Sequence, residues 1–180
     1  MFHNKLRIFL ATALIAVCAL AVPLSTTAAA TRVSFSLRSL DGVAVTSQGL
    51  RGQVVVFAFG ASWLPLSRKQ MQGMRQFAAQ NASRGVTFYW VSVDADNPKS
   101  KNYASDDDLR AFANKCGINV PVLRDADGAV SLKFGVDQLP AFVVLDRQGE
   151  TVGAPIGGLD PDGNIADQLN DPITEALARN

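Results

Sequence analysis

After residue 30, the hydrophobic residues of the chain fall into short runs that are separated by polar turns. Two of these runs, residues 53–59 and 86–93, are rich in β-branched and aromatic residues and show no alternation with polar ones. A continuous apolar run of this length is typical of a strand buried on both faces. The two runs therefore predict the central strands of a β-sheet.

Shorter strands are predicted on either side of this pair. Residues 33–40 and 43–45 flank the dipeptide Asp41-Gly42, which favours a tight turn, so they predict an N-terminal hairpin. Later strands are predicted at residues 122–123, 141–145 and 151–152. The last two are joined by the turn sequence 147–149, which predicts a second hairpin.

Four helical segments are predicted between and after these strands, at residues 65–80, 106–116, 129–134 and from Asp171 to about residue 179. Pro65 suits a first helical turn, where its missing N–H is not needed. Ser105 and Asp108 form a capping-box pattern before the second helix, and Gly117 ends it. The alternation of strands and helices predicts an α/β domain, with a mixed sheet covered by helices on both faces.

The first 30 residues have a different character. Lys5 and Arg7 precede an almost entirely apolar run at residues 8–24, and small residues follow up to Ala30. This pattern predicts a cleaved signal peptide at residues 1–30 and not a membrane anchor. The sequence contains no internal repeat or long linker, so we expect one domain over residues 31–180 and no membrane association after cleavage.

Residues 31–180 are poor in reactive side chains. The only histidine, His3, and one of the two cysteines, Cys18, lie in the predicted signal peptide, which leaves Cys116 alone. Without imidazole there is no Ser-His or Cys-His nucleophile pair and no histidine ligand for zinc, so we expect no metal or other cofactor. The formal net charge of the whole chain is +1, which gives no electrostatic case for nucleic-acid binding.

Residues 54–71 resemble the active-site segment of TlpA/ResA-type proteins, which belong to the thioredoxin-like AhpC/TSA redoxins. In those proteins a buried strand leads into an aromatic-Ala-x-Trp-Cys-x-x-Cys turn and a helix rich in Arg, Lys and Met. Residues 35–42 with 50–53, 90–94 and 134–149 are also similar, in the same order and spacing. The resemblance implies a thioredoxin fold with an N-terminal β-hairpin, and a secreted protein, most simply of the bacterial periplasm.

The redox motif of that family is degenerate in this chain. Its positions are occupied by Trp63, Leu64, Pro65, Leu66 and Ser67, so that leucine replaces the nucleophilic cysteine and serine the resolving one. Dithiol chemistry needs both thiols. Leucine cannot ionise, and a serine without a base is not activated. Residue 58, where the family commonly has a buried Asp or Asn, is alanine. We therefore expect no catalytic residue here.

Pro140 matches the family's cis-proline, whose loop faces the dithiol and pairs with an extended peptide, so we expect a cis bond after Leu139. Trp63, Leu66, Leu139 and Pro140 are the candidate peptide-binding residues, with Leu64 in the same patch. Exposed apolar clusters of this kind often mark interaction sites. The alternative is that Trp63 packs on the fold and the leucines are partly covered.

Three functions remain open at this point. The leading one is a secreted, non-catalytic protein- or peptide-binding module. A thiol-disulfide oxidoreductase or antioxidant role would use Cys116 as its reactive thiol, although this cysteine lies on the apolar face of a predicted helix, which favours a buried and inert thiol. The third is a structural scaffold subunit. Exposure of Cys116 would favour the second function, and burial of all three leucines would favour the third.

Overall fold

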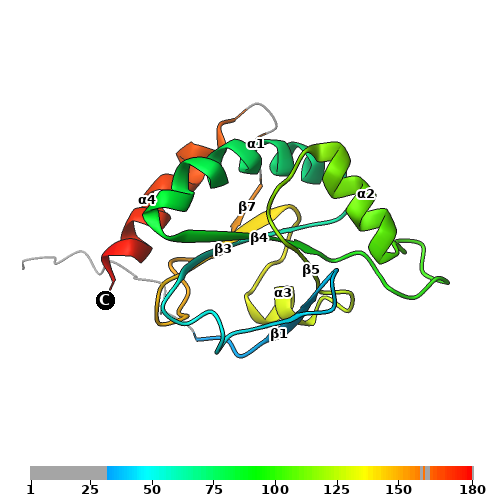
Figure 1. Cartoon of the computed structure of the whole chain (residues 1–180), viewed down its shortest axis with the longest axis horizontal. Helices are drawn as coiled ribbons and strands as arrows, with labels where there is room; N and C mark the ends of the chain where they lie inside the picture. Colours follow the sequence, from blue (N-terminus) through cyan, green and yellow to red (C-terminus); the bar gives the residue numbers. More distant parts are fainter. Residues whose placement is uncertain (1–31, 159, 161–162, 180) are drawn as a thin grey trace, which may run out of the picture.

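The computed structural model describes residues 32–158, 160 and 163–179. The predicted signal peptide lies outside the described residues. Seven strands form one mixed sheet in the order β2-β1-β5-β4-β3-β6-β7 (Figure 1). Their bounds are β1 Ser36–Ser39, β2 Ala44–Thr46, β3 Val54–Gly60, β4 Val86–Ser92, β5 Val122–Arg124, β6 Ala141–Leu145 and β7 Ile156–Gly157.

The predicted central strands, β3 and β4, lie side by side in the middle of the sheet. They pair in parallel over their whole length, from Val54 opposite Val86 to Gly60 opposite Ser92. Every residue of β3 is buried, as expected for an apolar run without alternation. The β4–β5 pair is also parallel, whereas β1–β2, β1–β5, β3–β6 and β6–β7 are antiparallel.

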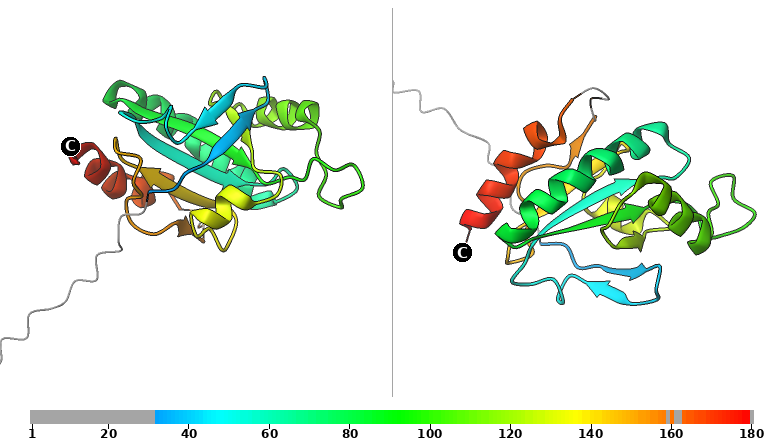
Figure 2. Two further views of the ribbon diagram at one scale, coloured as in Figure 1. Left: turned by 90° about the horizontal axis from the view of Figure 1, so that it is seen from below. Right: turned by 45° about the horizontal axis from the view of Figure 1, so that its top comes forward.

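Helices cover both faces of the sheet, as predicted. The described helices are α1 Pro65–Asn81, the short 3-10 helix η1 Ala82–Arg84, α2 Asp106–Cys116, α3 Ala129–Lys133 and α4 Ile165–Ala178. Helices α1, α2 and α4 lie on one face, and α3 lies on the other with the N-terminal segment (Figures 1 and 2). The capping box at Ser105 and Asp108 is present, and Gly117 ends α2 in a left-handed conformation with φ of 65°.

Each face of the sheet carries its own hydrophobic core. Val54, Val56 and Ala58 of β3 point toward α1, α2 and α4. The alternating residues Phe57 and Phe59, with Val55, point to the other face, where Phe57 contacts the rings of Phe35, Tyr89 and Phe134. This alternation is the ordinary period of a strand, and β3 is apolar on both faces because both are covered.

The last helix differs from the prediction, which began it at Asp171. Helix α4 begins six residues earlier, after Asn164, whose side-chain oxygen accepts a hydrogen bond from the N–H of Ala166. Pro172 therefore lies inside the helix, although proline removes a helical hydrogen bond. Leu169 and Ile173, on either side of Pro172, are fully buried in the same hydrophobic core. This packing outweighs the tendency of the proline to break or begin a helix.

The prediction of a strand at residues 151–152 is also wrong. The predicted hairpin is nevertheless present, because Thr151 forms an antiparallel bridge to Leu145 and the Val152 N–H donates to the carbonyl of Val144. Gly153 then has φ of 74°, and the chain turns away from β6. It returns at β7, a strand that the sequence did not predict.

Candidate functional site

The turn between β3 and α1 contains residues 63–67, the segment whose sequence resembles the family's redox motif. Pro65 is the first helical residue, as expected, and Leu64 precedes it without a side-chain cap. The turn is closed by the N–H of Leu64, which donates to the carbonyl of Ala61 at 3.2 Å, and by the N–H of Ser67, which donates to the carbonyl of Leu64 at 3.0 Å. Trp63 and Leu64 are thereby presented at the N-terminus of α1.

The candidate binding residues differ in exposure. Trp63 is 53% exposed, whereas Leu64, Leu66 and Leu139 are half-buried. Pro140 is buried, and the Leu139–Pro140 peptide bond is cis, as the resemblance implied. Trp63 is thus the residue of this set that projects most into solvent, and the leucines are neither fully covered nor fully open.

The β3–α1 turn and the Pro140 loop meet at the same end of the sheet. Ala141, directly after Pro140, pairs with Phe59 of β3. The side-chain amide of Gln70, on α1, donates to the carbonyl of Ala141 at 3.1 Å. This hydrogen bond joins the motif helix to the start of β6, and sequence reasoning did not identify it.

Ser67 has a structural role in this turn. Its side chain is fully buried, and its Oγ accepts a hydrogen bond from the N–H of Ala61 at 3.0 Å. A buried hydroxyl that closes a turn is not presented to a substrate, so the side chain of Ser67 is sequestered.

A small polar cluster lies beneath Ser67, where the chain closely approaches Gly60. A Cβ atom added at Gly60 would lie 2.7 Å from Ser67 Oγ, 3.0 Å from Trp90 Nε1 and 3.1 Å from Gln70 Oε1. Within the described part of the chain, Gln70 Oε1 and Trp90 Nε1 are buried without a hydrogen-bond partner. Only glycine fits at the end of β3 without displacing these side chains.

Asp94 holds the β3–α1 turn from the side of β4. This buried residue lies just after β4, and its carboxylate accepts hydrogen bonds from the N–H of Ser62 at 2.9 Å and the hydroxyl of Ser62 at 2.7 Å. The hydroxyl of Ser92 donates to the same carboxylate at 2.7 Å. From the sequence, Asp94 was recognised only as the acidic residue at the end of a predicted strand, and its hydrogen bonds to the turn were not predicted. An acidic residue directly after a buried strand is the feature from which this role could have been predicted.

Cys116 is buried at the end of α2, with 5% of its surface exposed. Burial raises the pKa of its thiol, and the nearby cations Arg68 and Lys115 act in the opposite direction. Because the thiolate is the nucleophile, a buried thiol with a raised pKa is poorly reactive at neutral pH. The structure therefore places this cysteine in the hydrophobic core and not in the β3–α1 turn.

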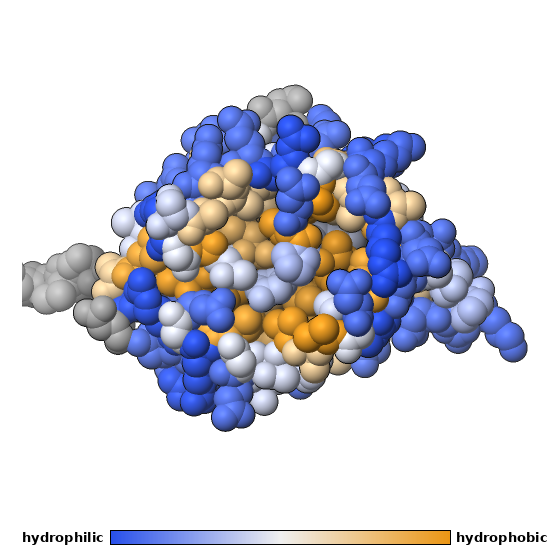
Figure 3. Space-filling model, in the orientation of Figure 1, coloured by the Kyte–Doolittle hydropathy of each residue, from blue (hydrophilic) through white to orange (hydrophobic). Residues whose placement is uncertain are grey.

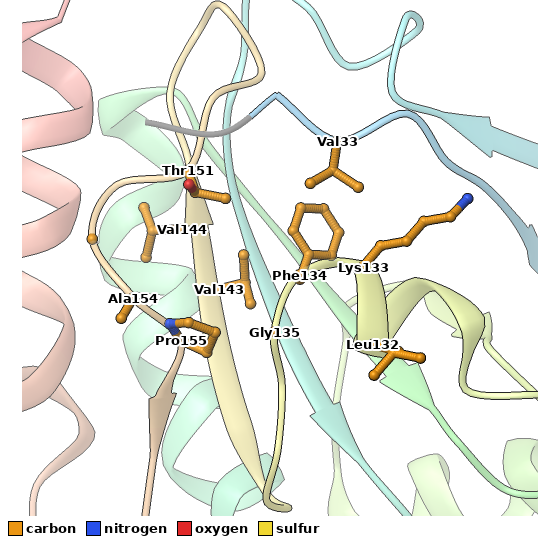
Figure 4. A pocket seen from close by; sticks show the side chains of 11 residues that line it. Val33, Leu132, Lys133, Phe134, Gly135, Val143, Val144, Thr151, Ala154 and Pro155 are labelled. Atoms are coloured by element: carbon orange, nitrogen blue, oxygen red, sulfur yellow. The ribbon is translucent and has the colours of Figure 1, made fainter. Parts of the chain in front are cut away.

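A separate hollow of about 280 Å³ lies between α3 and the segment after β6. Figure 4 shows that its apolar lining comes from Phe134, Val143 and Pro155, with Leu132 at its edge. Among the described residues that line it, only Lys133 carries a charge. No group of three or more His, Cys, Asp or Glu in the described part of the chain could hold a metal ion.

Comparison with known proteins agrees with this geometry. The model of the AhpC/TSA family matches residues 29–152, and the chain belongs to that family. The soluble secreted antigen MPT53 of Mycobacterium tuberculosis is 29% identical over 122 residues, which cover 68% of this chain and 64% of MPT53. The thiol-disulfide oxidoreductase ResA of Halalkalibacterium halodurans is 24% identical over 127 residues, 71% of this chain and 67% of ResA.

The solved structure of MTB dsbF, in mixed oxidised and reduced forms, is similar with a TM-score of 0.61 and 27% identity. The alignment covers 79% of this chain and 94% of dsbF. The fold is therefore the thioredoxin fold, and the protein is thioredoxin-like, of the TlpA/ResA type. Its similarity to MPT53 spans 64% of that relative's length, which is less than two thirds. Among the residues that the structure describes, no helix has the length and apolar character to cross a membrane.

Proposed function

We propose that this protein is an exported, non-catalytic thioredoxin-fold module that binds an extended segment of another protein around Trp63. The observation that carries the proposal is the pair of replacements in the redox motif. Leu64 has no ionisable group, and Ser67 is fully buried with its Oγ bonded to the N–H of Ala61. Neither residue supplies the exposed, activated nucleophile that thiol-disulfide exchange needs.

The surface around the turn supports binding. Among the described residues, the exposed large hydrophobic side chains are Val43, Trp63, Tyr103 and Leu132. Tryptophan is a common anchor of protein interfaces, since it buries a large apolar area and its ring nitrogen still donates a hydrogen bond. Three half-buried leucines belong to the same candidate set, and Asp94 and Gln70 hold the turn and α1 in place. A rigid support of this kind lowers the entropy cost of binding.

Export is supported by two observations. Residues 1–30 have the pattern of a signal peptide. The relative MPT53 is named a soluble secreted antigen. The bacterial periplasm is the location we propose, because the TlpA/ResA resemblance implies it.

The two alternatives have less support. An oxidoreductase role through Cys116 requires an accessible thiolate, whereas this thiol is 5% exposed and has a raised pKa. The names of the relatives favour such a role, but the family's chemistry runs through the two positions that are leucine and serine here. A scaffold role does not explain a tryptophan that is 53% exposed within the degenerate motif.

Binding is tested by selecting short peptides from a random library on the mature protein and measuring their affinity by titration calorimetry. We expect Trp63→Ala to weaken binding about thirty-fold, which is the loss typical of a central tryptophan anchor. Val43→Ala is the matched control, because Val43 is also exposed but belongs to the turn of the N-terminal hairpin. Equal affinity of the native protein and Trp63→Ala for every selected peptide would contradict the proposed site.

A further inference from the structure

One edge of β4 is only partly paired. β5 covers just the last part of β4, with Trp90 opposite Val122 and Ser92 opposite Arg124. The first hydrogen bond on this side is donated by the N–H of Trp90 to the carbonyl of Pro121 at 3.1 Å. The first four residues of β4, 86–89, therefore have no partner strand on this side within the described part of the chain.

Pro121 is the reason that the ladder stops there. Main-chain groups of alternate residues point to the same edge of a strand, so those of Val86 and Phe88 point to the same side as those of Trp90. The spacing of the parallel ladder puts residue 121 where an N–H would be needed for the carbonyl of Phe88. Proline has no N–H, and the pairing ends. Unpaired main-chain groups at a strand edge are a template for another strand.

A hollow of about 690 Å³ lies beside this edge. On one side it is bounded by small residues of α1 and η1, and on the other by the segment that leads into β5; its lining includes Ala78, Ala79, Ala82, Asn119, Val120 and Pro121. Figure 3, in the orientation of Figure 1, shows apolar side chains gathered across the middle of the face between α1 and β1, with hydrophilic residues around them. The alanines leave room for the side chains of an added strand.

The charge around this hollow is positive. Arg75 is the one charged residue that lines it, and it makes no hydrogen bond or ion pair with any described residue. Arg75 also lines the neighbouring hollow of about 410 Å³, together with Lys115 and the polar residues Gln72, Gln76 and Asn114. Two exposed cations thus stand at the end of an apolar groove without an acidic residue among its lining.

We propose that an extended segment of a partner protein adds as a strand to β4 beside Val86 and Phe88, with an acidic side chain at Arg75 and Lys115. Main-chain hydrogen bonds to the strand edge supply affinity in this mode of recognition, and side-chain contacts supply specificity. The unpaired edge selects an extended backbone, the space beside the alanines accommodates apolar side chains, and the two cations select a carboxylate.

This site is distinct from the Trp63 face. Val86 begins β4 and pairs with Val54 at the start of β3, whereas the Trp63 turn follows Gly60 at the end of β3. With seven residues in each strand, the two sites lie about 20 Å apart at opposite ends of the central strands. The proposal for the β4-edge site is therefore independent of the proposed function, and each can be tested without the other.

The test uses short peptides selected from a random library on the full folded protein that carries Trp63→Ala, so that binding at the Trp63 face does not contribute. We expect the selected peptides to carry an acidic residue beside apolar ones. We also expect them to slow hydrogen exchange at the amide of Phe88. Arg75→Glu should weaken binding about ten-fold or more, and binding should weaken with added salt. Lys101→Glu, on an exposed loop, is the matched charge-reversal control and should leave affinity unchanged.

A second variant fills the groove. Ala79 is exposed on α1, so Ala79→Phe should lower the free energy of unfolding only slightly, through weaker helix propensity, while it abolishes peptide binding. The proposal would be overturned if the selected peptides lacked acidic residues, or if Arg75→Glu bound them with unchanged affinity. It would also be overturned if hydrogen exchange at the amide of Phe88 were slowed by dimerisation of the chain, or by residues 1–31 of the same chain, and not by the peptide.

Discussion

Removal of the Asp94 carboxylate should destabilise the protein strongly, although this residue lies outside the segment 63–67. The carboxylate accepts three hydrogen bonds, from the N–H and the hydroxyl of Ser62 and from the hydroxyl of Ser92, at 2.7–2.9 Å. Asp94 is 1% exposed and Ser92 is fully buried, so water cannot readily replace the lost acceptor.

The magnitude follows from the cost of unmade hydrogen bonds. A hydrogen bond to a charged group contributes about 1.5–3 kcal/mol, and a buried donor left without a partner costs about 1–3 kcal/mol. The three bonds share one carboxylate and are not additive. We therefore expect Asp94→Ala to lower the free energy of unfolding by about 3 kcal/mol. Asp94→Asn keeps the shape and an acceptor oxygen, so its loss should be about half as large.

Urea unfolding followed by far-ultraviolet circular dichroism measures these losses. Asp96→Ala is the matched control, because Asp96 is exposed in the same loop and accepts no hydrogen bond from a described residue. Its free energy of unfolding should change by less than about 0.5 kcal/mol. If Asp94→Ala is no more destabilising than Asp96→Ala, Asp94 does not hold the β3–α1 turn in the way inferred from its hydrogen bonds.

Three further predictions concern Gly60, Asp106 and Cys116. Gly60→Ala should lower the free energy of unfolding, measured by urea titration, by about 2 kcal/mol, since the new methyl group would lie 2.7 Å from Ser67 Oγ. In a protein that already carries Ser67→Ala, the same change should cost less free energy, and a fully additive loss would contradict this contact. The hydrogen bond from Arg38 lowers the pKa of Asp106, so its stabilising effect is complete above the ordinary pKa of about 4 and is lost as pH falls through the lowered pKa. The difference in free energy of unfolding between the native protein and Asp106→Asn should therefore shrink below about pH 4, and a constant difference would refute the ion pair's role. Burial raises the pKa of the Cys116 thiol, so Ellman's reagent should react with it slowly in the folded protein and rapidly in urea, and fast reaction without urea would contradict its burial.

The parts of the fold that could be predicted are those with dense local signals. β3 and β4 are continuous apolar runs, and α2 carries its own start and stop signals at Ser105 and Gly117. The start of α4 could not be predicted in this way, because Pro172 argued locally for a helix start while burial of Leu169 and Ile173 decided the outcome. β7 has only two residues and depends on its partner β6, so its sequence contains no period to detect.

The candidate site shows the same division. The resemblance predicted the cis bond before Pro140, which is present, and the absence of thiols at residues 64 and 67 follows from residue identity alone. The burial of Ser67 and its contact with the N–H of Ala61 depend on how α1 packs against β3. The hydrogen bond between Gln70 and Ala141 joins residues far apart in the sequence, as does that between Asp94 and Ser62. No local pattern encodes such pairs.

The central claim is that the thioredoxin scaffold is intact and that its dithiol chemistry is absent because of residues 64 and 67. The most direct test is the dithiothreitol-driven reduction of insulin by the mature protein, compared with the double variant Leu64→Cys/Ser67→Cys. We expect no activity above background for the native protein, and reductase activity for the double variant, because it restores a thiol pair at the N-terminus of α1. Reductase activity of the native protein would contradict the claim, and its loss in Cys116→Ser would assign that activity to the lone thiol.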